Sequence, residues 1–283
     1  MKRKLLYLIT LTVALFFVFI FACKKESSQN QTTAVVDNTT LTANSVEKNA
    51  VIAVTTFEGI NQYAQAGFIS NNLKAGSISF GSCPTITVNY TTPPYSITLD
   101  WGTECTGIDG AKRSGKIDIS LNGIMNVANN VATLKIENYV VDGKTITGTT
   151  KITSAGPNPG NGWPRYDIVT EGKIVFADKS VLSYKYDGVT LQSEGTATPT
   201  VLSDDVWRTE VHSASGVNQD GTTWTAKSTK VMIKKGDCKW YNSGTFEITP
   251  SKGDVITIDF GDGTCDNKAT MKKGSVTTEI TLD

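Results

Sequence analysis

The chain has 283 residues, with 27 Lys and Arg against 27 Asp and Glu and a single histidine. A nucleic-acid-binding protein needs a concentrated positive surface. Beyond the first residues the sequence contains no basic block, so we exclude this class of partner. The length allows one large β domain or two small ones after the N-terminal segments described next.

The N-terminus has the pattern of a lipoprotein signal. Lys2, Arg3 and Lys4 form a basic start, and an uncharged apolar run from Leu5 to Ala22 follows, as in secretory signals. The run ends in Ile20-Phe21-Ala22-Cys23, which resembles the lipobox of lipoproteins, with a small residue before the cysteine that is acylated. We therefore expect residues 1–22 to be a signal peptide and Cys23 to carry the lipid.

An uncleaved transmembrane anchor is the alternative, because the run is also long enough to span a bilayer. A cysteine at the very end of the run, followed by Lys24, Lys25 and Glu26, favours the lipoprotein instead. By resemblance to other lipoproteins, the absence of Asp after Cys23 implies an outer-membrane lipoprotein, with the periplasmic and surface faces both open. Cleavage removes three basic and no acidic residues, which leaves 24 Lys and Arg against 27 Asp and Glu.

Residues 23–42 are predicted to be the lipidated cysteine and a flexible tether. Ser, Gln, Asn, Thr and Lys dominate this stretch, and no apolar period interrupts it. About 20 such residues separate the body from the membrane by roughly 25 Å on average. The body is then residues 43–283.

One amphipathic helix is predicted over residues 44–67. Asn44 and Glu47 have the spacing of a helix-capping pair, and Gly67 is placed to end the helix. Apolar residues recur between them at helical spacing: Val46, Ala50, Ala53, Val54, Phe57, Ile60 and Ala64.

From about residue 78 the pattern of apolar residues becomes one that predicts strands. Apolar and polar residues alternate in segments such as 97–101, 117–121 and 256–260, which is typical of antiparallel sheets with one face on a core. Tight hairpin turns are indicated by five Asp-Gly dipeptides, at positions 109–110, 142–143, 187–188, 220–221 and 262–263. The predicted fold class is therefore mostly β, with antiparallel meander or sandwich-like sheets and one N-terminal helix.

Two segments of the body repeat each other. Ile97-Thr98-Leu99-Asp100-Trp101-Gly102-Thr103-Glu104-Cys105 matches residues 256–265, Ile-Thr-Ile-Asp-Phe-Gly-Asp-Gly-Thr-Cys, with one residue inserted. This repeat predicts related β units at about 78–152 and 201–283.

The repeat also bears on the cysteines. An even number of cysteines remains after Cys23 in an exported chain, which indicates disulfides, and four cysteines allow three pairings. If the repeated units are equivalent, each closes on itself, which predicts Cys83–Cys105 and Cys238–Cys265. Zinc is disfavoured because no close cysteine pair is present.

Several pieces of the body together resemble a known family. The sequences ITLDWGTECTGIDGAKRSGKI, DGKTITGTTKI and ITIDFGDGTCDNKATMKKGSVTTEITL are similar to an uncharacterised Bacteroidota-type family of cell-envelope lipoproteins. The resemblance spans most of the body and implies an all-β fold and an outer-membrane or surface location. It implies no activity, since none is assigned to the family.

Candidate catalytic and metal-binding residues are few. His212 is predicted on the polar face of a strand with Arg208 and Glu210, and no G-x-S-x-G elbow accompanies it, so we interpret it as a surface residue. Oxygen ligands for calcium are gathered in one turn by Asp259, Asp262, Asp266 and Asn267, without the EF-hand spacing. Aspartates in turns mostly bond the backbone, so we predict no metal and no cofactor.

Aromatic side chains provide the most concrete binding hypothesis. Trp163 lies in a loop rich in Gly, Pro and Asn, whereas Trp207, Trp224 and Trp240 lie in strand-like stretches that indicate a core position. An exposed loop aromatic suits ligand contact, so Trp163 is the candidate ligand-binding residue.

The sequence therefore predicts a non-catalytic, lipid-anchored cell-envelope protein with a structural or partner-binding role. Its expected partners are the membrane, through the lipid, and a glycan or an envelope protein. A carbohydrate-binding surface lipoprotein is the first alternative and a glycan hydrolase the second, because paired carboxylates occur by chance among 27 acidic residues. No motif nominates a catalytic pair.

Overall fold

The structure is a computed structural model that describes residues 39–40, 48–53, 64–65, 76–79, 83–198 and 201–282. Every described residue belongs to one compact unit, Asp37–Asp283. The predicted signal peptide, Cys23 and most of the predicted tether lie outside the described residues. Their assignments stay predictions from the sequence.

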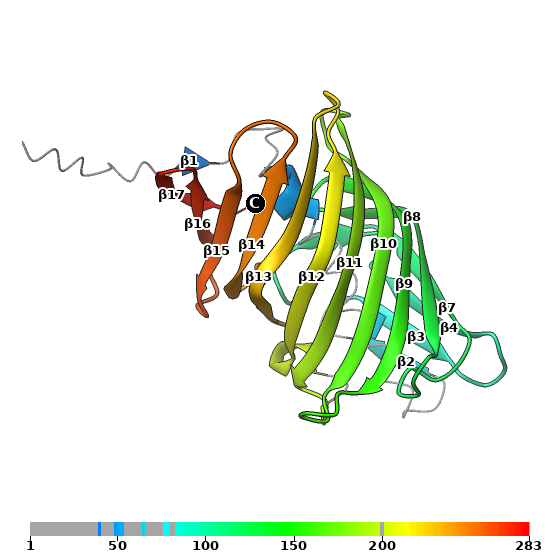
Figure 1. The fold of residues 1–283 in the computed structure, drawn as a ribbon. Helices are drawn as coiled ribbons and strands as arrows, with labels where there is room; N and C mark the ends of the chain where they lie inside the picture. The colour runs from blue at the N-terminus through cyan, green and yellow to red at the C-terminus, as the bar shows by residue number, and fades with distance from the viewer. Residues whose placement is uncertain are drawn as a thin grey trace, which may run out of the picture. The chain divides into compact units, whose positions relative to one another are not determined.

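Within the described residues, seventeen strands form a single sheet (Figure 1). The first seven are β1 (Thr39–Thr40), β2 (Gly76–Ser79), β3 (Thr85–Asn89), β4 (Tyr95–Asp100), β5 (Cys105–Thr106), β6 (Lys112–Ser114) and β7 (Lys116–Leu121). The six long strands are β8 (Val131–Val141), β9 (Lys144–Pro157), β10 (Pro164–Val175), β11 (Val181–Glu194), β12 (Val206–Val217) and β13 (Thr223–Lys235). The last four are β14 (Ser243–Pro250), β15 (Ile256–Asp262), β16 (Lys268–Lys273) and β17 (Val276–Thr281), and a short 3-10 helix, η2 (Leu202–Asp204), precedes β12.

The strands follow one another as an antiparallel meander. Each strand from β7 to β17 pairs with its neighbour in the chain, so that β10 to β14 lie side by side in Figure 1. On the other side, β2, β3 and β4 pair in order and β4 pairs with β7, while β5 and β6 form a branch on β8. Only the short β1 pairs in parallel, with β17. The predicted mostly β, antiparallel class is confirmed.

The alternation of apolar and polar residues along each strand determines which face of the sheet is buried. In β7, Ile117, Ile119 and Leu121 are buried while the residues between them are exposed, as expected for a strand with one face on the core. The same pattern continues through the long strands, and the inward residues form one connected hydrophobic core. Because full burial of an aliphatic side chain contributes about 1.5–3 kcal/mol, this face provides the main stabilisation of the fold.

The predicted helix is present in part. Residues 48–53 and 64–65 are helical, and the rest of the predicted range 44–67 lies outside the described residues. Ala50 and Ala53 are fully buried, in agreement with the apolar stripe. The Asn49 side chain donates a hydrogen bond to the Asn218 side-chain oxygen at the β12–β13 turn, at 3.0 Å, which fixes this helical segment against the sheet.

The repeated segments form similar local structures. Trp101 follows β4 and its counterpart Phe260 lies in β15, and both side chains are buried. Each ring packs on a buried tyrosine, Trp101 on Tyr139 with ring centroids 4.7 Å apart and Phe260 on Tyr241 at 5.2 Å.

The cysteines pair within each unit. The structure joins Cys83 to Cys105 and Cys238 to Cys265, with Cα–Cα distances of 6.2 and 5.8 Å. These are the two pairs that the repeat predicts.

Two of the five Asp-Gly predictions are wrong. Asp262-Gly263 forms no tight hairpin turn, because Asp262 still pairs with Ser243 as the last residue of β15 and β16 begins only at Lys268. Asp142-Gly143 forms the two-residue turn between β8 and β9, with positive φ at both residues, but Asp187-Gly188 lies in the middle of β11. A Cβ atom on Gly188 would lie 2.5 Å from the Tyr186 hydroxyl and 2.6 Å from the Glu210 carbonyl. Glycine is required there for a close approach and not for a turn.

Candidate functional site: a trough on the outer face of the sheet

A β-bulge in β12 breaks the regular sheet. Asp187 of β11 pairs with Ser213, but the next residue, Gly188, pairs with Val211, so His212 is an extra residue. Both His212 and Ser213 are exposed as a result. Bulges bend a strand and re-aim side chains, and they are frequent beside functional sites.

The neighbouring ladder is also open at this point. In β12, Thr209 and Ala214 pair with β13, but the four residues between them do not. The Ser228 hydroxyl fills part of the gap, because it accepts a hydrogen bond from the Val211 amide at 2.9 Å. A bulged β12 beside a partly unpaired β13 therefore hollows the solvent-facing side of the sheet.

The hollow is a trough of about 730 Å³ that crosses β10 to β14. We call it the outer trough and define it by its charged lining: Glu171, Lys185, Asp187, His212, Lys227 and Glu247. A second hollow of about 550 Å³ lies beside it across β9 to β13 and shares Glu171, Lys185, Ser215 and Thr225 with it. At about 4.8 Å between strands, five strands give a trough roughly 19 Å long.

The charges of the outer trough are paired across neighbouring strands. Glu171 lies 3.3 Å from Lys185, Asp187 lies 3.6 Å from His212, and Glu247 lies 3.7 Å from Lys227. Most of these side chains are more than half exposed, so each pair contributes little to stability. The groups therefore remain free to exchange their partners for a polar ligand.

The outer trough does not contain a catalytic triad around His212. As the sequence predicts, His212 lies on the polar face of β12, and its partner is the Asp187 carboxylate. Its side chain forms no hydrogen bond with a serine, threonine or cysteine of the described residues. At 3.6 Å the imidazole and the Asp187 carboxylate are too far apart to share a hydrogen bond, so the described residues form neither contact of a triad around His212.

The sequence predicts the exposure of four tryptophans, and three of these predictions agree with the structure. Trp207 and Trp224 are each 1% exposed and belong to the core, and Trp240 is partly buried beneath the Lys239 ammonium. Trp163 is half-buried, and the Arg208 guanidinium lies 5.4 Å from its ring centroid. The candidate ligand-binding residue is thus paired with an arginine that the sequence did not connect to it.

The aspartates considered for calcium bond their own turns. The side chain of Asp259 accepts from the Gly261 amide, Asp262 from the Thr264 amide, and Asp266 from the amide two residues ahead. The described residues contain no cluster of three or more His, Cys, Asp or Glu that could hold a metal ion.

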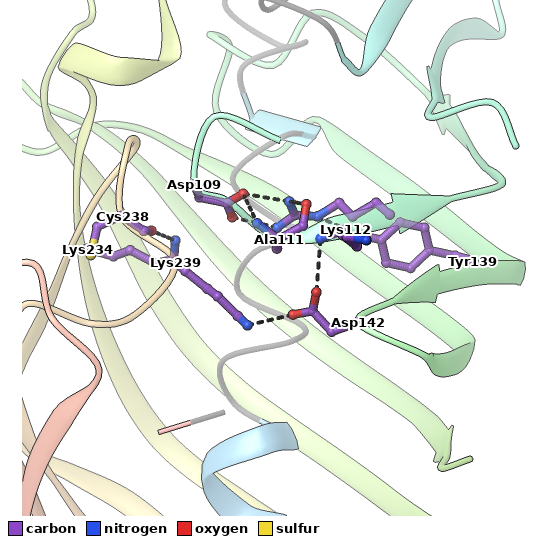
Figure 2. A network of polar contacts seen from close by, with 9 residues as sticks. Asp109, Ala111, Lys112, Tyr139, Asp142, Lys234, Cys238 and Lys239 are labelled. Carbon is purple, nitrogen blue, oxygen red and sulfur yellow. Dashed lines mark hydrogen bonds and ion pairs between the residues drawn. The ribbon is translucent and has the colours of Figure 1, made fainter. Parts of the chain in front are cut away.

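A second polar cluster lies where the β8–β9 turn meets the β13–β14 connection (Figure 2). Arg113 bonds Asp109 at 2.6 Å and donates to the Tyr139 hydroxyl at 2.9 Å, while Lys239 bonds Asp142 at 2.8 Å. Burial opposes ionisation of Asp109, but the Arg113 guanidinium still holds its pKa below the usual range. Burial also raises the pKa of Tyr139 to about 12. These groups satisfy one another, which makes the cluster a structural link between distant parts of the sheet.

One buried carboxyl gave no signal in the sequence. Asp205, between η2 and β12, is 4% exposed, and burial raises its pKa to about 7. It accepts one hydrogen bond, from the Gln192 side-chain nitrogen at 2.7 Å. A Cβ atom on Gly195 would lie 2.0 Å from its carboxyl oxygen, so the group is tightly enclosed by the chain and does not line the outer trough.

Comparisons with known proteins identify no family for this chain. No protein-family model matches the chain, and no match was found among curated proteins or solved structures. In the part of the chain that the structure describes, no helix is long and apolar enough to cross a membrane.

Proposed function

We propose that this chain is a lipid-anchored, non-catalytic cell-envelope protein that binds an extended polar ligand in the outer trough. Two features of the sequence support the anchor, namely the basic start with its apolar run and the Ala22-Cys23 junction. The observation that carries the binding role is the bulge at His212, which hollows a surface that a regular strand would leave even.

The lining determines the chemistry of the ligand. Three carboxylates face two lysines and one histidine, and Ser213, Ser215 and Thr225 add hydroxyls. Such a surface offers donors and acceptors in nearly equal number and no concentrated charge, which suits a neutral or weakly charged polymer. The open shape suits an extended ligand that crosses several strands.

A carbohydrate is the favoured ligand class, because an aromatic side chain lies on the same face. Trp163 precedes β10, and Val169 of the same strand lines the outer trough. An indole ring offers an apolar surface on which the C–H face of a sugar can stack, while its N–H remains available for hydrogen bonding.

The anchor is tested at Cys23. Cys23→Ser should abolish incorporation of labelled palmitate and block cleavage of the signal. A wild-type chain that takes up no lipid label would point instead to a transmembrane anchor or to a secreted protein.

The trough is tested by removing the bulge. Deletion of His212 restores strict alternation between Val211 and Ala214, so we expect the strand to stay paired while the trough flattens. His212→Ala is the matched control, because it removes the imidazole but keeps the extra residue. On an array of envelope polysaccharide fragments, the deletion should abolish the binding that the wild-type chain shows, and His212→Ala should retain most of it.

Two results would contradict the proposal. Binding that persists in the deletion variant would place the ligand elsewhere. Turnover of any fragment by the wild-type chain that is lost in His212→Ala would make the protein an enzyme.

A further inference from the structure

Two arginines lie on either side of one strand on the outer face. Arg165 of β10 pairs with Leu191 of β11, and Leu191 pairs with Arg208 of β12. Paired residues of neighbouring strands point to the same side of a sheet, so both guanidinium groups extend on the outer side, with their strands roughly 10 Å apart. Leu191 between them is 8% exposed.

The positive charge of this pair is poorly compensated. The Arg208 side chain forms no ion pair or hydrogen bond with a described residue, and its Nε is shielded from solvent without a partner. Arg165 has one partner, the Asp167 carboxylate at 3.3 Å, and its Nε is likewise shielded and unpaired. A guanidinium carries five donors, so most of the donors of this pair are available to an acceptor from outside.

Trp163 holds Arg208 in place. The guanidinium lies 5.4 Å from the centre of the indole ring, the geometry of a cation–π contact. The indole itself is positioned by its loop, because the Asn158 amide donates to the Trp163 carbonyl at 2.8 Å and the Trp163 amide donates to Asn161 at 3.0 Å. The guanidinium is thus oriented before any ligand arrives, which lowers the entropic cost of binding.

We infer that Arg208, Arg165 and Trp163 form a binding site for the carboxylate of an acidic sugar, such as a uronic acid within a polysaccharide. This inference rests on the proposed function and names the ligand class for the same face. A planar guanidinium matches a carboxylate with two parallel hydrogen bonds. The indole beside it favours a carboxylate carried on a sugar ring over one on a flexible acidic peptide.

The position of the site fits a polymer. Arg208 and His212 lie four residues apart on β12, or about 13 Å, so one oligosaccharide can reach both the arginine site and the outer trough. The site binds one carboxylate, and the near-neutral trough accommodates the rest of the chain.

The test compares tetragalacturonate with its methyl ester, which has the same sugar skeleton without the charge. Binding is measured by calorimetry on the full mature chain at 0.15 M salt, in a zwitterionic detergent whose headgroup is not a sugar. We expect the acid to bind at least tenfold more tightly than the ester. Arg208→Gln should abolish this preference, and Arg208→Lys should lose most of it, because an ammonium lacks the planar fork.

The controls separate charge, stacking and folding. Lys272→Gln removes the same charge from an exposed position on β16 and should keep the preference for the acid. Trp163→Leu should weaken the binding of both forms and should also reduce the preference for the acid, because it removes the ring that orients the Arg208 guanidinium. Circular dichroism of each variant establishes whether it is folded. If Arg208→Gln does not fold, Trp163→Leu provides a second test of the site.

Each result supports or overturns the inference. Equal affinity for acid and ester, with both lost on deletion of His212, refutes the arginine site but leaves the proposed function intact. Failure to bind either form refutes the acidic-sugar assignment, while the polysaccharide array decides the proposed function separately. A poly-glutamate peptide that binds as tightly as tetragalacturonate would make the ligand a peptide and overturn the sugar.

Discussion

Asp205 is the residue whose replacement should change stability most clearly with pH. Its carboxyl is enclosed by the chain and accepts a single hydrogen bond, from Gln192. Gln192 also has a buried oxygen without a hydrogen-bond partner, and a protonated Asp205 would bring the O–H donor that this oxygen lacks. Asparagine keeps the shape, supplies a donor and cannot ionise, so Asp205→Asn should stabilise the fold at neutral and higher pH.

The size of the change in the free energy of unfolding follows from the pKa of Asp205. Burial raises the pKa of Asp205 from its ordinary 3.8 to about 7. Between these values the folded chain keeps a proton that the unfolded chain has lost, so the free energy of unfolding falls as pH rises through this window. One pKa unit corresponds to about 1.4 kcal/mol, which gives a loss of up to about 4 kcal/mol above pH 7. Asp205→Asn cannot ionise, so its free energy of unfolding should not show this loss. Near pH 4 the free energies of unfolding of the wild type and the variant should be similar.

The assay is urea unfolding of residues 24–283 at pH 4.5, 6, 7 and 8.5, for the wild type and for Asp205→Asn. The difference in free energy of unfolding should grow with pH and level off above pH 7. Asp237→Asn removes a charge from an exposed position nearby and should stay within about 0.5 kcal/mol of the wild type. A difference for Asp205→Asn that stays constant with pH would show that the group ionises normally, and the reasoning would fail.

Three further stability predictions use the same unfolding assay. Cys238→Ser should cost about 3 kcal/mol, because it opens a cross-link between residues 27 positions apart; unchanged stability would show that the cross-link contributes little. Gly216→Ala should cost more than about 1 kcal/mol, since its Cβ would lie 2.2 Å from the Trp224 ring, whereas Gly160→Ala, with its nearest atom at 3.4 Å, should be nearly neutral. Asp109→Asn should cost about 3 kcal/mol at pH 7, because it removes the carboxylate that compensates the charge of the buried Arg113 guanidinium. That cost should shrink below pH 4, where protonation of Asp109 weakens the pair in the wild type as well, and a cost that does not depend on pH would contradict this account.

Much of the fold could be predicted from local patterns. Alternation marks strands such as β7 and β15 because one face of each is on the core, and a repeated segment is sufficient to choose between three cysteine pairings. The Asp-Gly signal failed at Asp187-Gly188, because a dipeptide does not distinguish a glycine in a turn from one required by close packing. Most pairings of the single sheet join consecutive strands, but no local pattern encodes the pairings of β4 with β7, β6 with β8 and β1 with β17.

The outer trough has one sequence signal that could have revealed it. Inward residues of β12 are odd-numbered as far as Val211 and even-numbered from Ala214, so the alternation slips by one at His212 and Ser213. Such a slip predicts a bulge. The site around Trp163 has no such signal, since it brings together residues that are distant in sequence through the register of three strands.

The two faces of the sheet therefore have separate roles. On the inner face, some polar side chains satisfy one another, as Thr150 and Thr170 do at 3.0 Å and Thr190 and Thr209 at 3.3 Å. Replacing such a buried hydroxyl leaves its partner unsatisfied and costs stability. On the outer face the ion pairs are exposed and contribute little to stability, so these residues can change without loss of the fold. The outer face of this sheet can thus vary in sequence while the inner face and the two disulfides keep the structure constant.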